Sequence, residues 1–372
     1  MMKKINGHEM IQLFEAFAPK ALAMDGDKIG LQIGRLNKPV YRVMIALDVL
    51  EEVVDEAIEK EVDLIIAHHP LIYRPLAAIT TDKLPGRMIE KLLKHEIAVY
   101  AAHTNLDIAK GGVNDLLAEA LRLSNTEVLA PTYEVKLKKM VVFVPKEDSR
   151  KVKEAIGNAG AGSIGNYSHC LYSSSGIGQF LPGDKANPHI GQNGQLEEVK
   201  EERIETIFPD YLERKVVQAM LKAHPYEEVA YDIYHLDNKG EVLGLGRIGE
   251  IEETTLGEFA KFVKQALDVP TLRVVGDLSE KVKKVAVLGG DGNKYISSAK
   301  FKGADVYITG DLYYHVAHDA MMMGLNVIDP GHNVEKIMKQ GVSRYLTNRC
   351  QEKGYDVAVF PSEKGTEPFQ FV

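Results

Sequence analysis

The sequence predicts an α/β protein in which two sister α/β halves form one domain and a smaller α+β domain is inserted between them. Three observations predict this fold. Short β-rich runs alternate with helical periodicity near both ends of the chain. The two alternating regions match at a constant offset, and the segment between them follows a different order. The expected boundaries are residues 1–130, 131–240 and 241–372.

The first half shows its alternation between residues 40 and 121. Strands are expected at VYRVMIALDV (40–49), DLIIA (63–67) and EIAVYAA (96–102), and helices at 50–58 and at RMIEKLLK (87–94). Strands that alternate with helices in this way favour a mainly parallel sheet covered by helices.

The second half repeats this layout in VKKVAVLGG, KYISSAKF, ADVYITGD and LNVIDPGH. The offset between equivalent residues is 242, and it holds for Val40 and Val282, Val43 and Val285, Ala57 and Ala299, and Asp63 and Asp305. Hydrophobic strands match by chance at single positions, but a constant offset through strand, helix and strand favours an internal repeat.

The inserted segment has the order of a ferredoxin-like sandwich. Its expected elements are a strand at 135–145, a helix at 148–160, a Gly/Ser/Asn-rich stretch at 162–195, a strand at 201–208, a helix at 211–224 and a strand at 228–236.

Composition limits the function classes. The 45 basic and 53 acidic side chains give a net charge of -8, which disfavours nucleic acid or an anionic membrane as partner. The first residues are too polar for a signal peptide, and no run approaches the roughly 20 apolar residues of a membrane span, so the cytoplasm is the expected location. With Cys170 and Cys350 as its only cysteines, the chain must hold any metal with nitrogen and oxygen.

Imidazoles and carboxylates follow several expected strands. His68 and His69 come directly after DLIIA, Asp107 lies just beyond EIAVYAA, and His332 and Glu335 follow LNVID as an i, i+3 pair. In open α/β sheets, ligands bind at the carboxyl ends of the strands. Each piece also has a plain structural interpretation, since adjacent histidines occur in surface loops and Glu335 can cap a helix.

Together these three imidazoles and two carboxylates, at strand ends of two sister halves, predict a site for two divalent ions. Zinc is the expected metal, with iron and manganese as alternatives, because calcium prefers more oxygen ligands and copper(I) prefers sulfur. His103 and His315 are candidates for proton transfer. His318 and the Thr309–Asp311 segment flank the same region, and for His315, His318 and Asp311 a capping or packing role is the alternative.

Two glycine-rich motifs have plainer interpretations. The GxGxxG pattern of Gly244–Gly249 lacks the helix that a dinucleotide-binding loop requires, because the next helical run starts only near Thr255. The loop GGDGN at 289–293 can present amides to a phosphate, but a simple turn is the expected structure.

The chain resembles the Nif-three-like family, whose members are also called GTP cyclohydrolase I type 2 homologs. The resemblance spans the whole chain and lies in GLQIGR, IIAHHPLIY, AHTNLD, GLGRIGE, VAVLGGDG, ITGDLYYHVAHDA and DPGHNVE. It implies a dinuclear site on the same five residues, a PII- or CutA-like insert and a homo-hexamer. Many relatives carry Trp-Asp-Asn before the GL motif, where this chain has Met24–Lys28.

The leading functional hypothesis is a metal-dependent hydrolase that acts on a small nucleotide-like substrate. The resemblance implies GTP cyclohydrolase I type 2 activity, which converts GTP to dihydroneopterin triphosphate and formate, and related nucleotide or phosphoester hydrolysis is a further option. The alternative is a metal-handling or regulatory binding protein whose PII-like insert senses a metabolite.

Overall fold

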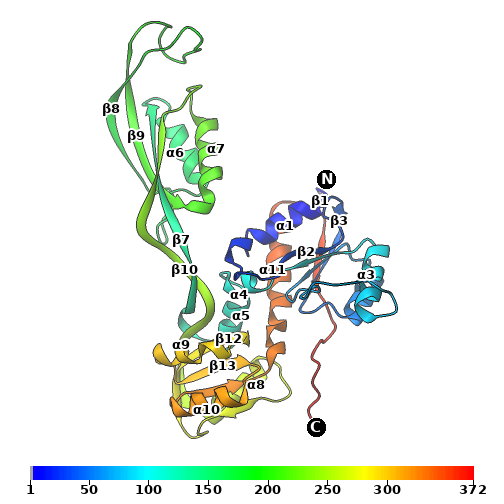
Figure 1. Cartoon of the computed structure of the whole chain (residues 1–372). Coiled ribbons are helices and arrows are strands. Elements are labelled where there is room, and N and C mark those ends of the chain that lie inside the picture. The colour runs from blue at the N-terminus through cyan, green and yellow to red at the C-terminus, as the bar shows by residue number, and fades with distance from the viewer. Residues whose placement is uncertain (1–2) are drawn as a thin grey trace. The chain divides into compact units, whose positions relative to one another are not determined.

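A computed structural model describes residues 3–372 (Figure 1). The chain divides into two compact units: unit 1 comprises Met1–Tyr133 and Leu243–Val372, and unit 2 comprises Glu134–Val242. Within the described residues, no helix is long and apolar enough to cross a bilayer.

The first half of unit 1 is a five-stranded sheet. Its strand order is β15 (Ala358–Pro361), β4 (Arg42–Ala46), β5 (Leu64–Ala67), β6 (Ala98–Ala101) and β2 (Gly30–Ile33). The first four strands run parallel, and β2 is antiparallel at one edge. Helix α2 (Glu51–Glu59) connects β4 to β5, and α3 (Leu84–Lys94) connects β5 to β6. The predicted alternation of strands and helices is therefore confirmed here.

The second half of unit 1 has the same core arrangement. Parallel strands β12 (Lys281–Asp291), β13 (Val306–Gly310) and β14 (Asn326–Asp329) are flanked by antiparallel β10 (Tyr231–Thr255) and β11 (Arg273–Val275). Its helices are α8 (Leu256–Ala266), α9 (Ile296–Phe301), α10 (Tyr314–Met322) and the long α11 (Ile337–Glu352). The remaining short elements are β1 (Ile5–Asn6), α1 (Gly7–Glu15), η1 (Lys20–Leu22), β3 (Pro39–Val40), α4 (Thr104–Ile108), α5 (Val113–Ala120), η3 (Asn293–Tyr295) and η4 (His332–Lys336).

The offset of 242 holds in the hydrogen bonds of the two halves. Asp63 Oδ2 accepts from the backbone N–H groups of Tyr41 and Arg42 at 2.7 and 3.0 Å. Asp305 Oδ2 accepts from those of Lys283 and Lys284, at 2.9 and 2.7 Å. Strand pairing follows the same register, with Val43 opposite Leu64 and Val285 opposite Val306. The sequence match therefore marks equivalent positions of two similar substructures.

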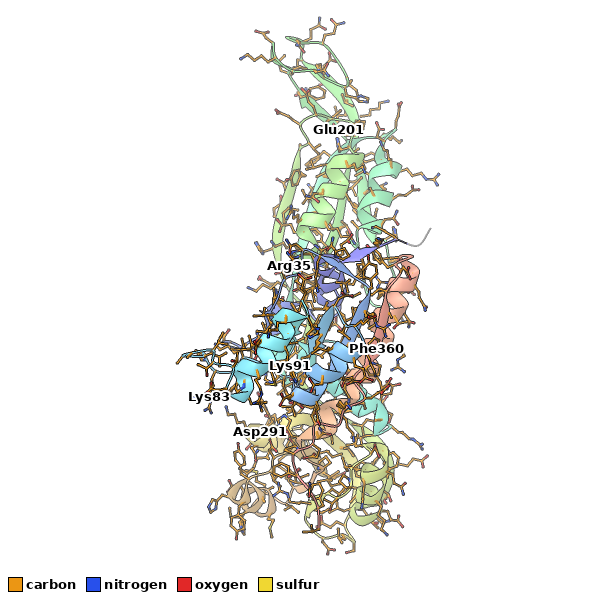
Figure 2. All side chains as sticks on the ribbon, turned by 90° about the vertical axis from the view of Figure 1, so that its right-hand side faces the viewer. Arg35, Lys83, Lys91, Glu201, Asp291 and Phe360 are labelled. Carbon is orange, nitrogen blue, oxygen red and sulfur yellow. The ribbon has the colours of Figure 1, made fainter. Side chains whose placement is uncertain are left out.

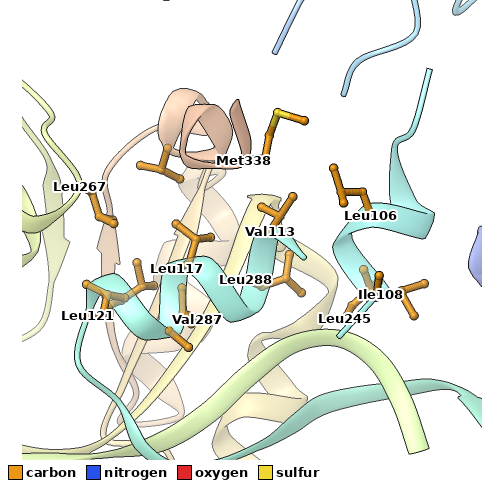
Figure 3. Close-up of a cluster of buried hydrophobic side chains, with 14 of the residues drawn as sticks. Leu106, Ile108, Val113, Leu117, Leu121, Leu245, Leu267, Val287, Leu288 and Met338 are labelled. Atoms are coloured by element: carbon orange, nitrogen blue, oxygen red, sulfur yellow. The ribbon is translucent and has the colours of Figure 1, made fainter. Parts of the chain in front are cut away.

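A buried apolar cluster holds together the elements that carry the site (Figure 3). Leu106 and Ile108 of α4, Leu117 of α5, Leu288 of β12 and Met338 of α11 are all at most 5% exposed. Burying a leucine-sized side chain contributes about 1.5–3 kcal/mol. Because Leu106 and Ile108 flank Asp107, this packing fixes the position of that carboxylate.

Unit 2 follows the order β7 (Ser124–Pro145), α6 (Ser149–Asn158), β8 (Leu171–Phe180), β9 (Glu197–Pro209), η2 (Asp210–Leu212), α7 (Glu213–Ala223) and β10. Strands β7 and β10 run through the boundary between the units in sequence. The order within the sheet is β10-β7-β9-β8. Helices α6 and α7 contribute apolar side chains to a separate core with β7 and β9.

Strand β8 lies inside the Gly/Ser/Asn-rich stretch, where the sequence pattern gives no strand bounds. It pairs along its whole length with β9, from Leu171 opposite Thr206 to Phe180 opposite Glu197. This strand is therefore held by its partner, since its small residues give no hydrophobic alternation. The GxGxxG segment lies within β10 and no helix starts there, so the rejection of a dinucleotide-binding loop is confirmed.

The chain after β15 is anchored to α2 by the buried Glu56. Its carboxylate accepts hydrogen bonds from the Ser362 hydroxyl, the Glu363 backbone N–H at 2.9 Å and the Lys60 ammonium at 2.8 Å. Burial raises the pKa of Glu56, but these donors outweigh it and lower the pKa overall. Nearby Phe360 (Figure 2) has the Lys60 ammonium 5.7 Å from its ring centroid.

We expect Glu56→Gln to destabilise the protein by about 1–2 kcal/mol near pH 7, because the donors lose a charged acceptor. Since the folded-state pKa of Glu56 is depressed, its contribution is present above its unfolded value near 4.5 and is lost as the pH falls further. Urea unfolding of wild type and variant at pH 7 and below pH 4 measures this difference.

Glu59→Gln, at an exposed position of the same helix, is the control and should change the unfolding free energy little at either pH. A Glu56→Gln effect that stays constant, or grows, as the pH falls would contradict the assigned role of the ionised carboxylate.

Candidate metal centre

The five predicted ligands lie at the carboxyl ends of strands in both halves of unit 1. His68 and His69 follow β5 directly, and Asp107 lies on the short helix α4 that follows β6. His332 and Glu335 lie on η4, which follows β14 after Pro330 and Gly331.

Glu335 is at the middle of the group. Its Oε2 lies 3.0 Å from His69 Nε2, 3.2 Å from His332 Nε2 and 3.6 Å from His68 Nε2. His68 Nε2 also lies 3.5 Å from Asp107 Oδ1. Donor atoms within 4.8 Å of one another form three overlapping sets: His68, His69 and His103; His69, His332 and Glu335; and His68, Asp107 and Glu335. The structure therefore brings all five predicted ligands together and adds His103.

A divalent ion fits these residues. His68 Nε2 and Asp107 Oδ1 are buried and have no hydrogen-bond partner within residues 3–372. Leaving buried polar atoms unpaired costs about 1–3 kcal/mol each, and a cation between the two atoms would satisfy both. Histidine nitrogen and carboxylate oxygen are ligands that zinc, manganese and iron accept. The group can therefore hold a metal ion.

The buried imidazoles and carboxylates of the site stabilise each other's charged forms. Burial alone lowers the pKa of His69, but the carboxylates of Asp48 and Glu335 raise it to about 9 overall. Burial raises the pKa of Asp107 to about 6, against the opposing effect of His68. For Glu335 the neighbouring imidazoles outweigh burial and hold its pKa well below the usual range. Metal ions compete with protons for these same atoms.

Each imidazole is oriented through its Nδ1 atom, which leaves Nε2 for the site. His69 Nδ1 lies 2.7 Å from Asp48 Oδ1, His332 Nδ1 lies 2.6 Å from Asp311 Oδ2, and His68 Nδ1 lies 2.9 Å from the Ala102 carbonyl. A carboxylate or carbonyl behind a histidine fixes the ring and strengthens it as a metal ligand. The same pattern at successive histidines is typical of a metal centre.

The last residues of β12 leave space for the central carboxylate. Gly290 has a φ of 65°, and a Cβ atom built there would lie 2.6 Å from Glu335 Oε1. The GGDGN segment is not the simple turn that the sequence predicted: residues 289–291 form the end of β12, and Asn293 begins the 3-10 element η3. Its second glycine permits the close approach of Glu335.

A comparison of the whole sequence with known protein families identifies the family of this chain. The profile of the family described as Duf34/NIF3 (NGG1p interacting factor 3) matches residues 5–368. The chain belongs to this family. The predicted resemblance is therefore confirmed.

Several relatives match this NIF3-family chain over its full length. A Bacillus subtilis protein named GTP cyclohydrolase 1 type 2 homolog is 65% identical, with 100% of each chain covered. A protein of the same name from Halalkalibacterium halodurans is 60% identical, again over 100% of each chain. The crystal structure of a Bacillus cereus protein related to NIF3 is 65% identical, with a TM-score of 0.94 and 100% of both chains covered.

His103 lies next to His68 and His69 in the site. Its ring is held by Asp27, in a segment for which the sequence predicted no role. Its Nδ1 lies 2.8 Å from Asp27 Oδ1, and the other oxygen of Asp27 accepts the Thr104 backbone N–H at 3.0 Å. Asp27 belongs to Met24–Lys28, the segment that precedes the GLQIGR motif. Asp27 and Asp48 are the positioning residues that sequence reasoning missed. No local motif marks them, because each acts on a histidine more than 20 residues away.

The structure does not bring His315 into the group. It lies exposed on α10, its ring packs edge-on against Tyr314, and it belongs to none of the three ligand sets in the described part of the chain. His318 is also exposed on α10 and packs against the same tyrosine. Thr309 is buried, and its hydroxyl accepts a hydrogen bond from the Gly292 N–H at 2.9 Å, which stabilises the fold.

The helix expected around His332 begins differently. Residues His332–Lys336 form a 3-10 turn, and the α-helix starts only at Ile337. In a 3-10 turn, residues i and i+3 lie above one another, which places His332 and Glu335 side by side. Because the Glu335 carboxylate contacts imidazoles, a role as helix cap alone does not account for its position.

We predict that Asp311→Asn lowers metal affinity about 10- to 100-fold, because His332 loses the carboxylate behind its ring. Asp319→Asn, at an exposed position on α10, is the matched control and should leave affinity unchanged. Competition with a chelator of known affinity measures the change. Equal affinities in wild type and both variants would show that Asp311 does not position a ligand.

Proposed function

We propose that the chain is a dinuclear metal-dependent hydrolase with a small nucleotide-like substrate. The observation that carries this proposal is the buried pair His68 Nε2 and Asp107 Oδ1, which lack hydrogen-bond partners within the described residues and lie among further imidazole and carboxylate ligands. These two atoms lie 3.5 Å apart and make no hydrogen bond among the described residues, an arrangement that suits a shared cation.

His68, His69, Asp107, His332 and Glu335 would hold two divalent ions. Zinc suits the mixture of imidazole and carboxylate, and iron or manganese are the alternatives. Divalent ions supply Lewis acidity, which polarises a substrate oxygen and lowers the pKa of water. Overlap of the three ligand sets supports two ions, because His68, His69 and Glu335 each occur in two sets.

The chain's own side chains orient the substrate and transfer protons. His68 is completely buried, whereas the His69, His103 and His332 side chains are 24%, 26% and 38% exposed. Substrate therefore reaches the site from the side of these three rings. His103 belongs to one ligand set only and is held by Asp27, so we assign it the transfer of protons to and from substrate. His315 stays a candidate on sequence grounds alone.

The substrate class is supported by the name that relatives carry, GTP cyclohydrolase 1 type 2 homolog. GTP ring opening to dihydroneopterin triphosphate and formate is the specific form of the proposal, and hydrolysis of another nucleotide or phosphoester is its broader form. The described residues of the centre support metal-assisted hydrolysis without distinguishing guanine from other bases.

We further propose that unit 2 is a ferredoxin-like domain of the PII and CutA type. Its support is the sheet order β10-β7-β9-β8 with both helices between strands, which places the first and third strands of the β-α-β, β-α-β order next to each other. A homo-hexamer and a cytoplasmic location remain predictions from the sequence.

Metal analysis and a substrate screen test the proposal. Protein purified without added metal should contain about two ions per chain, and Asp107→Ala should lose metal and turnover together, because Asp107 would bind metal directly. The screen covers GTP, other nucleotides and phosphoesters. Asp115→Ala is unsuitable as a control because Asp115 pairs with Arg247, so the exposed Asp25→Ala serves instead.

Fewer than about one ion per chain in wild type, with no change in Asp107→Ala, would contradict the metal centre itself. Full metal content without turnover, together with rapid exchange of the ions to a chelator or partner protein, would favour the alternative of a metal-handling protein.

A further inference from the structure

A cavity of about 790 Å³ lies within unit 2, away in sequence from every residue of the metal centre. Its volume falls in the range of about 300–1,000 Å³ that is typical of small-molecule sites. Glu201 of β9, labelled in Figure 2, lines it together with residues of β8 and of the loops that follow β8 and α7.

The floor of the cavity is one face of the β8–β9 pair. Ser174 lies opposite Arg203 and Gly176 opposite Glu201, so these four residues project from the same face. The helices cover the other face, where Lys153 of α6 bonds Ser173 and Glu202. Small residues on β8 next to long ones on β9 leave space above β8, and a Cβ atom built at Gly176 meets no atom within 4 Å.

Glu201 is a buried carboxylate in this space, with its residue only 9% exposed. The Tyr226 hydroxyl donates to its Oε1 at 3.1 Å, and this is its one hydrogen bond among the described residues. Oε2 lies over Gly178, where a Cβ atom would be 2.1 Å away. Glycine at 178 thus leaves room for this oxygen, to which no residue in the described part of the chain donates a hydrogen bond. Oε2 is open to the cavity and can accept hydrogen bonds from a ligand.

Aromatic and apolar side chains form the walls. The rings of Phe180 and Tyr226 pack edge to face, with centroids 5.8 Å apart. His189, from the loop after β8, has its ring centroid 6.3 Å from that of Tyr226. Pro182 and Ile190 of the same loop also line the cavity. Flat rings beside a carboxylate suit a flat ligand with donors on its edge.

We propose that this cavity binds a planar heteroaromatic molecule that presents paired N–H donors to Glu201. A carboxylate accepts two parallel N–H bonds from such an edge, as it does from arginine. A purely apolar ligand would leave Oε2 without a donor. All lining residues belong to unit 2 and the metal ligands to unit 1, so removal of metal should not change the affinity of the cavity for this ligand.

The test uses 2-aminobenzimidazole as the probe, titrated into the full-length protein by calorimetry. Benzothiazole, which has a similar ring system and no N–H, is the control compound. The probe should bind wild type and benzothiazole should bind at least about tenfold more weakly, because charge-assisted hydrogen bonds are lost.

Three variants locate the binding. Glu201→Gln should weaken the probe about tenfold or more, because the charged acceptor is lost. Gly176→Val should abolish binding by filling the floor, at a position where an added Cβ meets no neighbour. Glu147→Gln, at an exposed position of unit 2 outside the lining, is the matched control and should bind like wild type. Unchanged thermal unfolding shows that each variant is folded.

Absence of probe binding by wild type up to about 10 mM would overturn the proposal. Equal binding by wild type, Glu201→Gln and Gly176→Val would also overturn it. A wild type that fails to bind the probe, combined with a changed oligomeric state of Gly176→Val in sedimentation, would assign the cavity to contacts between copies of the chain and not to a small molecule.

Discussion

The buried carboxylate of Glu335 imposes the constraint on which the site depends. It is 3% exposed and lies within 3.6 Å of imidazole nitrogens from both halves of unit 1. A buried carboxylate requires positive charge or donors around it. The histidines that follow β5 and the histidine of η4 can provide these only if the carboxyl ends of the two sheets face one another. The packing of α4, α5, α11 and β12 around one apolar cluster holds those ends in place (Figure 3).

The internal repeat has diverged where the chemistry lies. At the offset of 242, His68 and His69 correspond to Gly310 and Asp311. The first half thus places two imidazoles at the end of its middle strand, whereas the second half places Asp311 there, behind the ring of His332. Asp311 has a φ of 53°, a left-handed conformation that aspartate tolerates better than most residues. The two halves therefore share a scaffold and divide the roles of ligand and positioning residue.

Sequence predicted the parts that follow from periodicity and strand ends. The alternation in unit 1, the 242-residue offset and the meeting of the five ligands at strand ends all follow from local patterns and from the topology of parallel sheets. Strand β8 could not be bounded in this way, because its pairing with β9, and not hydrophobic alternation, fixes it. Asp27 and Asp48 were missed because their contacts are long-range. The 3-10 turn at His332 was missed because the helical pattern continues through it.

The most direct test of the metal centre is X-ray diffraction from crystals of the protein, measured on both sides of the absorption edge of the metal found by elemental analysis. Our account predicts two anomalous peaks, each within about 2.0–2.3 Å of nitrogen or oxygen atoms of His68, His69, Asp107, His332 or Glu335. Crystals that contain metal elsewhere, with no anomalous peak between His68 Nε2 and Asp107 Oδ1, would contradict it.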